Sequence, residues 1–292
     1  MKTISVCHPP DAVPQRRTTL SNPETNNNAD KELPTTPLKP PLKWAGGKRW
    51  LVPQVAAIWE QHEDRRYVEP FCGGLAVALG LRPRRALLND VNPHLINFYR
   101  QVQSGLQVSV DMRNDEMTFY AHRDRFNQLI RQDGDETPEA AQLFYYLNRT
   151  CFNGLCRFNR SGEFNVPFGT YKQITYASDF YHYLKLFKNW TFTNHHLEDL
   201  PLEKNDFVYA DPPYDVQFTT YSAGGFTWED QVGTAELLAA HPGPVVLSNQ
   251  ATPRIVGLYE RLNFDLRYLE APRRISCTGD RTAAREVLAV KI

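Results

Sequence analysis

The sequence lacks the features that mark membrane, secreted and fibrous proteins. Its 292 residues contain no run of about 18 apolar residues, which a membrane-spanning helix requires. Residues 1–10 are too short and too polar a start for a secretory signal. The five cysteines are scattered and odd in number, which indicates reduced thiols in a cytoplasm rather than a disulfide framework. We therefore expect a cytoplasmic globular chain of one large domain or two smaller ones.

A net charge is also absent, because 33 Lys and Arg residues balance 33 Asp and Glu residues. A neutral total argues weakly against nucleic-acid binding, since such domains are commonly basic. The basic residues are nevertheless clustered. Between Arg267 and Arg285 five Arg accompany two acids, and between Arg149 and Lys172 three Arg and one Lys accompany Glu163 alone. We expect both stretches to contact phosphates.

Glycine and aromatic residues are missing from residues 1–42, which hold 8 of the 21 prolines. Such a segment buries too little apolar surface to offset the entropy lost on ordering. We expect a disordered arm over 1–41, and nothing in it resembles a functional motif.

Beyond Leu42, short apolar stretches alternate with glycine turns and helical patterns. Strands are expected at residues 67–69, 86–88, 190–192, 207–209, 245–247, 264–269 and 287–292. Helices are expected at residues 51–59, 75–81, from 93 onward, 114–132, 138–152 and 179–188. This alternation predicts an α/β fold with a parallel sheet. A hairpin signal at 156–166, among aromatic-rich helices, predicts that a domain at 104–188 interrupts a sheet domain made of 42–103 and 189–292.

The sharpest motif is Asp211-Pro212-Pro213-Tyr214, which directly follows the apolar run 207–210. In open α/β sheets, ligands bind beyond the carboxyl ends of the strands. Two prolines there fix the backbone and leave carbonyl oxygens without a competing local N–H. This rigid corner suits a planar heterocycle with an exocyclic amine. Asp211 and the Pro212 carbonyl would accept its two N–H bonds, while Tyr214 stacks on the ring.

Two glycine turns precede this motif in the chain. In Lys43-Trp44-Ala45-Gly46-Gly47-Lys48, adjacent glycines allow close approach to a ligand, and a Lys on each flank suits a carboxylate. It is not a P-loop, because the second glycine spacing is absent. The turn Glu69-Pro70-Phe71-Cys72-Gly73-Gly74 joins strand to helix, as in nucleotide-cofactor sites. The next strand ends at Asn89-Asp90, where Rossmann-like sites place a carboxylate that binds ribose.

A zinc site is a weaker interpretation of the middle of the chain. Cys151, Cys156, His195 and His196 are residue types that bind zinc, but a paired C-x₂-C spacing is missing. We interpret them as ordinary core or surface residues, and we expect no metal.

Taken together, these motifs resemble the Dam family of DNA adenine-N6 methyltransferases (D12 class, α motif order). The resemblance runs from about residue 42 to the C-terminus and keeps the family's motif order. It also covers the segment 148–169, Ser248-Asn249 and Arg273-Arg274-Ile275-Ser276. The chain departs from it at Leu75, where many members carry another glycine, and at Phe152, where tyrosine is common. The resemblance implies a Rossmann-like methyltransferase sheet with a helical target-recognition insertion that carries a β-hairpin.

The same resemblance implies S-adenosylmethionine as cofactor, double-stranded DNA as partner and particular residues for each role. The catalytic residues that it implies are Asp211, Pro212 and Tyr214. The cofactor-binding residues that it implies are Trp44, Lys48, Phe71, Gly73, Asp90 and Asp211. The DNA-binding residues that it implies, for a GATC site, are Lys43, Asn153, Leu155, Arg157, Pro167, Tyr171, Arg273, Arg274 and Ser276. Among them, Asn153 would enter the space left by a flipped adenine, and an Arg fork such as Arg157 matches guanine O6 and N7.

The predicted function is site-specific DNA adenine-N6 methylation at GATC. Because N6 is inaccessible inside the duplex, the adenine must be flipped out. We expect a monomer without an obligatory protein partner, in the cytoplasm of a bacterium or a phage-infected bacterium. Two alternatives stay open: methylation of another exocyclic amine, such as cytosine N4 or an RNA base, and a catalytically silent DNA-binding protein. The hairpin argues against the first, and the intact Asp211 motif and Asp90 argue against the second.

Overall fold

The computed structural model describes residues 33–215, 225–271 and 284–292. Residues 1–32 of the expected arm, and the predicted site residues Arg273, Arg274 and Ser276, lie outside these ranges. The chain divides into a unit of 1–32 and a unit of 33–292, and the second is described here. Residues 33–41 differ from the expected disordered arm, because they contact the rest of this unit. Leu38 packs on the apolar core, and the Tyr183 hydroxyl donates to the Lys39 carbonyl at 2.6 Å.

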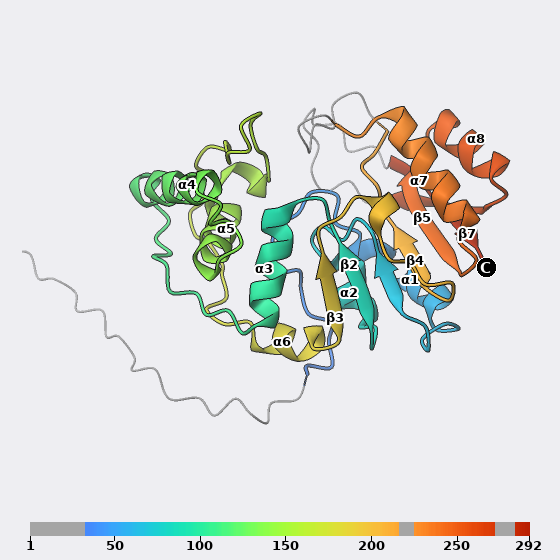
Figure 1. Cartoon of the computed structure of the whole chain (residues 1–292), viewed down its shortest axis with the longest axis horizontal. Coiled ribbons are helices and arrows are strands. Elements are labelled where there is room, and N and C mark those ends of the chain that lie inside the picture. Colours follow the sequence, from blue (N-terminus) through green and yellow to red (C-terminus); the bar gives the residue numbers. More distant parts are fainter. Residues whose placement is uncertain (1–32, 216–224, 272–283) are drawn as a thin grey trace, which may run out of the picture. The chain divides into compact units, whose positions relative to one another are not determined.

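A sheet of seven described strands forms the centre of the unit (Figure 1). The strands are β1 (Tyr67–Glu69), β2 (Ala86–Asn89), β3 (Trp190–Thr193), β4 (Phe207–Ala210), β5 (Val245–Gln250), β6 (Asp265–Ala271) and β7 (Ala284–Lys291). Their order is β3-β2-β1-β4-β5-β7-β6, and among these strands β7 alone runs against the others. The predicted α/β fold with a mostly parallel, Rossmann-like sheet is therefore confirmed.

The α-helices of the described ranges include all those expected from the sequence and two that were not expected, and three short 3-10 helices (η) accompany them. The helices are η1 (Arg49–Leu51), α1 (Val52–Trp59), α2 (Ala76–Leu81), α3 (Pro93–Gln103), α4 (Glu116–Arg131), α5 (Pro138–Thr150), η2 (Phe152–Gly154), α6 (Tyr181–Phe187), η3 (Leu197–Asp199), α7 (Trp228–Ala240) and α8 (Pro253–Arg261). The unexpected ones are α7 and α8. Among these helices, none has both the length and the apolar character needed to cross a membrane.

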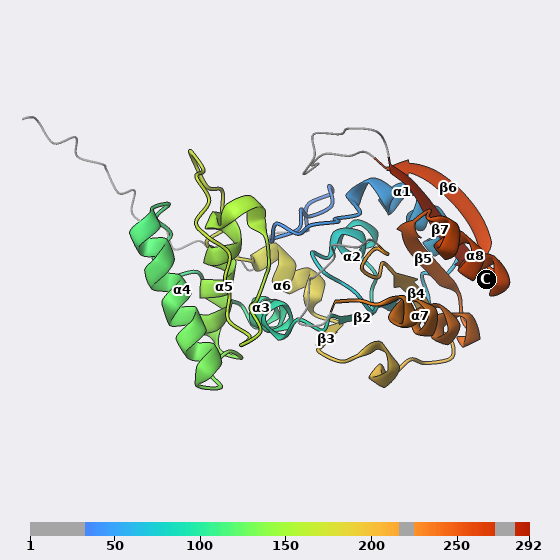
Figure 2. The same ribbon diagram turned by 90° about the horizontal axis from the view of Figure 1, so that it is seen from above.

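Two apolar cores cover the two faces of the sheet. Along β1 and β4, Tyr67 and Phe207 belong to a core shared with α1, α2 and α3, whereas Val68 and Val208 belong to a core shared with α7 and α8. This alternation follows the period of two in a strand, because successive side chains point to opposite faces. The result is a three-layer sandwich, and Figure 2 shows α1 and α7 on opposite sides of the strands.

The helices α4 and α5 of the insertion lie beyond α3, on the far side of that helix from the sheet, in both views (Figures 1 and 2). Its α5 packs against α3 and α4, whereas α6 packs against α3 and β3. The expected hairpin is present but short. Phe158 and Phe164 form its bridge, and the Asn127 side chain of α4 bonds both backbone groups of Phe164, at 2.8 and 3.1 Å. The hairpin is thereby fixed to α4.

Candidate active site

Acidic residues from distant parts of the chain gather at one edge of the sheet. Because β1, β2 and β4 are parallel, their carboxyl ends place Glu69, Asp90 and Asp211 at this edge. The reversed strand β7 brings its beginning to the same edge, and with it Glu286. Burial raises the pKa of each of these four carboxyls. An acidic edge of this kind favours a cationic ligand.

Asp211 presents one oxygen to protein groups and leaves the other available. Its Oδ1 accepts from Ser248 Oγ at 2.8 Å and lies 3.1 Å from Lys48 Nζ. No residue in the described ranges donates to its Oδ2, or to the carbonyl of Pro212. The next carbonyl, that of Pro213, accepts from Gln231 Nε2 of α7 at 2.5 Å. Two acceptors thus remain for a ligand, which is the number that an exocyclic amine requires.

Lys48 and Tyr214 are joined to each other beside Asp211. Lys48 is buried, with 4% of its surface exposed, and its Nζ donates to the Tyr214 hydroxyl at 2.8 Å. The hydroxyl donates in turn to Glu286. Lys48 was expected to meet a ligand carboxylate, but in the structure its ammonium contacts carboxylates of the protein. The lysine therefore belongs to the corner around Asp211.

The two glycine turns pack on each other through Trp44. A Cβ atom at Gly73 would lie 2.6 Å from Trp44 Nε1, and one at Gly74 would lie 2.8 Å from Trp44 Cβ. Only glycine therefore fits here without a shift, and Gly73 also has a positive φ of 42°. Phe71 contacts the edge of the Phe226 ring, with the centroids 5.9 Å apart. The turn, the indole and Asp90 form a cradle of the kind that holds a nucleoside cofactor.

Asp90 is held at this cradle by backbone groups. Its Oδ2 accepts from Gly73 N at 3.1 Å, and its Oδ1 accepts from Asn92 N at 3.0 Å. Burial raises the pKa of Asp90 to about 6, although these two N–H groups oppose the rise. The carboxylate lies next to the glycine turn, as a ribose-binding residue must.

The ribose contact predicted for Asp90 needs the ionised carboxylate, so cofactor affinity is expected to fall in mild acid. With a pKa of about 6, the ionised fraction falls from roughly nine-tenths at pH 7 to roughly one-tenth at pH 5. The Kd of S-adenosylmethionine should therefore rise about tenfold, which calorimetric titration at the two pH values measures. Asp90→Asn should bind weakly and lose this pH dependence. An unchanged pH dependence in that variant would remove Asp90 from the cofactor site.

Leu75, where the sequence departs from the family's usual glycine, adopts a left-handed conformation. Its φ is 60° and ψ is 27°, at the residue that caps the start of α2. This conformation costs a non-glycine residue roughly 1–2 kcal/mol. The Leu75 side chain is fully buried in the core, and its burial stabilises the fold by about 1.5–3 kcal/mol, which offsets the cost of the backbone conformation. The backbone path of the turn is therefore kept without glycine.

Lys43 connects the first glycine turn to the helical insertion. Its backbone N–H and C=O each bond the Asn148 side chain at 2.8 Å, and its Nζ donates to the Arg149 carbonyl at 2.9 Å. The ammonium lies 3.7 Å from the centre of the Tyr171 ring. A Cβ at Gly154 would lie 2.6 Å from the Lys43 Cβ. The structure thus brings together two predicted DNA-binding residues, Lys43 and Tyr171, next to the turn that contains Asn153.

The other predicted DNA-binding residues of the insertion lie on the hairpin and the turn before it. Asn153 and Arg157 are exposed, and Asn153 has a positive φ of 53°. Arg157 Nε donates to Asn165 Oδ1 at 2.8 Å. Leu155 is partly exposed and Pro167 is exposed. The Pro167 carbonyl accepts from the N–H of Phe152.

The sequence analysis missed several residues of these sites. Phe152 has a side chain that is 50% exposed, and its position as an aromatic residue in a turn is a signal that the sequence offers. Glu286 would have been indicated by an isolated acid at the start of an apolar strand. Gln231 and Asn148 carry no local signal, because only the folded chain brings them to Pro213 and Lys43.

The cysteines expected to be ordinary residues are free thiols. Cys151 is buried and bonds the Leu155 carbonyl at 3.3 Å, and Cys156 Sγ accepts from Asn92 Nδ2 at 3.4 Å. Within the described ranges, no three His, Cys, Asp or Glu side chains come together as a metal site.

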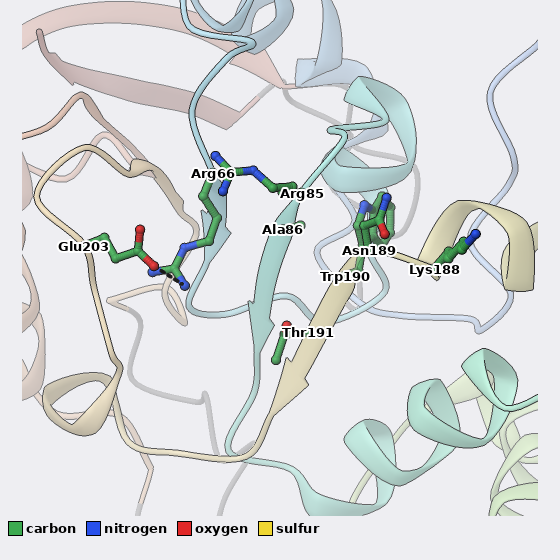
Figure 3. A pocket seen from close by; sticks show the side chains of 8 residues that line it. All are labelled: Arg66, Arg85, Ala86, Lys188, Asn189, Trp190, Thr191 and Glu203. Carbon is green, nitrogen blue, oxygen red and sulfur yellow. Dashed lines mark ion pairs between the residues drawn. The ribbon is translucent and has the colours of Figure 1, made fainter.

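A pocket of about 580 Å³ lies at the opposite edge of the sheet (Figure 3). Ala86 and Trp190 line it, and they are the first residues of β2 and β3. Arg66 and Glu203 form an ion pair across it at 3.2 Å. Since ligands of open α/β sheets bind at the carboxyl ends of strands, this pocket is separate from the candidate active site.

The sheet order, the cradle at Asp90 and the corner at Asp211 define a Rossmann-like methyltransferase that uses S-adenosylmethionine. The family model of the D12 class N6 adenine-specific DNA methyltransferases matches residues 44–275 of this chain. The chain belongs to this family, and it is an adenine-specific DNA methyltransferase.

Named relatives are similar over most of the chain. The retron Ec67 DNA adenine methylase of Escherichia coli is 34% identical over 85% of this chain and 90% of its own length. The type II methyltransferase M.MjaIII of Methanocaldococcus jannaschii is 32% identical over 84% of this chain and 95% of its own length. A DNA adenine methylase of Vibrio cholerae is 34% identical over 85% of this chain and 94% of its own length.

Proposed function

We propose that the protein flips an adenine out of duplex DNA and methylates its N6 at GATC sites. The observation that carries this proposal is the pair of available acceptors, Asp211 Oδ2 and the Pro212 carbonyl, at the carboxyl end of β4. An adenine amine held by both acceptors has left the base stack, because N6 cannot reach such a corner from inside the duplex.

The chain's own groups activate the amine. S-adenosylmethionine, when bound, supplies a methyl group already activated on a sulfonium. The N6 lone pair is delocalised into the adenine ring, and hydrogen bonds to Asp211 and Pro212 localise it as the nitrogen becomes tetrahedral. These bonds strengthen in the transition state more than in the ground state. Once N6 has accepted the methyl group it would lose its extra proton, and Asp211 Oδ2 is placed to receive that proton.

The residues at the cradle fit the cofactor. Trp44, Gly73 and Phe71 supply a close apolar surface, and Asp90 supplies an acceptor for ribose hydroxyls. The sulfonium is cationic, and the Asp211 carboxylate, which Lys48 and Ser248 help to keep ionised, is attractive to it. Lys48 contributes to this site by holding Asp211, and it lies beside the proposed cofactor cradle.

The insertion, with the proposed limits 104–188, recognises the DNA. Asn153 fills the space left by the adenine, and the exposed Phe152 ring stacks beside it. Arg157 reads guanine, while Leu155 and Pro167 contact thymine methyl groups. Lys43 and Tyr171 complete the surface, and Arg273, Arg274 and Ser276 of the C-terminal part contact phosphates. The protein acts as a monomer in a bacterial cytoplasm, without an obligatory protein partner.

A restriction digest tests the proposed site. Plasmid DNA from cells without their own adenine methylation, but expressing this protein, should resist an enzyme that cuts only unmethylated GATC. It should be cut by an enzyme that requires methylated GATC. DNA from cells that express the Asp211→Ala variant provides the control and should show the reverse. Methylated adenine found only outside GATC would refute the proposed site and leave the adenine chemistry in place.

A further inference from the structure

Glu286 is a buried carboxylate that the proposed reaction does not yet use. It lies near the start of β7, is followed by the buried residues Val287 and Leu288, and is 5% exposed. Removing a carboxylate from water is costly unless partners compensate for it. The partners of Glu286 therefore indicate what keeps it there.

The register of the sheet aims Glu286 at the corner around Asp211. Glu286 pairs with Gln250 across the antiparallel ladder, two residues beyond Ser248 on β5. Because side chains alternate with a period of two, Glu286 and Ser248 share one face of the sheet. Ser248 is the residue that donates to Asp211 Oδ1.

Both oxygens of Glu286 face the groups that surround Asp211. Its Oε1 accepts from the Tyr214 hydroxyl, and its Oε2, which has no hydrogen bond to any described residue, lies 3.9 Å from Lys48 Nζ. Lys48 thus lies between two carboxylates, at 3.1 Å from one and 3.9 Å from the other. The Tyr214 ring is fixed at its hydroxyl end by Lys48 and Glu286 together.

We propose that Glu286 is a positioning residue for methyl transfer, which acts through Lys48 and Tyr214 to orient Asp211 and the stacking ring. Glu286 and Asp211 both attract the Lys48 ammonium, so Asp211 carries only part of that interaction. Lys48 can therefore hold Asp211 Oδ1 while Oδ2 stays a strong hydrogen-bond acceptor. It also fixes the tyrosine ring at the distance from Asp211 that a planar base requires. This inference rests on the proposed role of Asp211 and adds a residue that touches neither base nor cofactor.

Glu286→Gln tests the proposal, because the change keeps the shape and removes the charge. Its single-turnover methylation rate on a GATC duplex should fall about 10- to 100-fold, the loss expected when a reacting group is misplaced. Because Glu286 touches neither ligand, the Kd values for S-adenosylmethionine and for DNA should stay within about threefold of the wild type. The matched control is Glu270→Gln, the same change at an exposed residue of the neighbouring strand β6, which should leave the rate unchanged.

A second experiment, in a variant protein, shows whether Glu286 acts through its contacts with Lys48 and Tyr214. In a variant with Lys48→Met and Tyr214→Phe, which lacks both groups that Glu286 touches, adding Glu286→Gln should change the residual rate less than about threefold. Coupling of this kind is the signature of residues that act as a unit. A full 10- to 100-fold further loss in this background would contradict action through Lys48 and Tyr214.

Other outcomes separate this inference from the proposed function. If Glu286→Gln keeps the wild-type rate while Asp211→Ala is inactive, the inference fails and the proposed function stands. If Asp211→Ala is itself active, the proposed function fails. If Glu286→Gln weakens cofactor binding in parallel with the rate, Glu286 binds the cofactor directly and the positioning role is wrong. Thermal unfolding of each variant identifies a rate loss that comes from instability, which would also contradict the proposal.

Discussion

Replacing Asp211 with alanine is expected to reduce methyl transfer by about 10³-fold or more, while DNA binding persists. The change removes the acceptor that strengthens as N6 becomes tetrahedral, and interactions confined to the transition state affect the rate rather than binding. Most of the proposed DNA-binding residues lie on the insertion rather than in this corner. Single-turnover methylation and separate titrations of each ligand give the required comparison.

The fold should tolerate this change, because Lys48 is not left alone. Without Asp211, its ammonium still donates to the Tyr214 hydroxyl at 2.8 Å and lies 3.9 Å from Glu286. Asp211→Asn provides the matched isostere: its amide keeps the shape and should be similarly inactive, since an N–H facing N6 replaces an acceptor. Near-normal turnover in either variant would end the mechanism proposed here.

Much of the fold could be predicted from the sequence because its strands carry a strong local signal. β4 is a four-residue buried stretch that ends at Asp211, and β2 ends at Asn89, one residue before Asp90. The helices α7 and α8 were missed although their start signals were present. Thr227 and Asp230 form a capping box, and Thr252 precedes a proline at the first helical position.

The candidate site could be predicted wherever its residues are close in sequence, and only there. Asp211, Pro212 and Tyr214 form one motif, and Trp44 and Lys48 form another. Contacts between motifs depend on tertiary structure. Lys48 was assigned to a ligand carboxylate because nothing in the sequence shows that it packs beside Asp211 and, through a reversed strand, beside Glu286. Antiparallel β7 lies more than 70 residues after β4, and no local pattern predicts that the two strands flank β5.

Replacing Arg157 with alanine is expected to relax the sequence requirement at one base pair of the site. Arg157 is exposed on the hairpin, where its Nε donates to Asn165 Oδ1 at 2.8 Å and its Nη2 donates to the Asn165 carbonyl at 3.3 Å. These two bonds fix the guanidinium plane, and each terminal nitrogen keeps an N–H that can face guanine O6 or N7. A bidentate contact of this kind contributes about 1–3 kcal/mol of discrimination, or roughly 5- to 150-fold. The preference for GATC over a variant with one guanine replaced should fall by about that factor.

Arg160→Ala is the matched control for this experiment, because Arg160 is an exposed arginine three residues further along the same hairpin. A residue that contacts only phosphate should weaken all sequences alike when it is removed. Turnover on GATC and on its single-base variants, measured for both proteins and the wild type, separates the two roles. The Kd for S-adenosylmethionine should stay unchanged in Arg157→Ala, since Trp44 and Asp90 lie on separate loops. Equal loss on every sequence in Arg157→Ala would show that Arg157 clamps the backbone and that another residue reads the guanine.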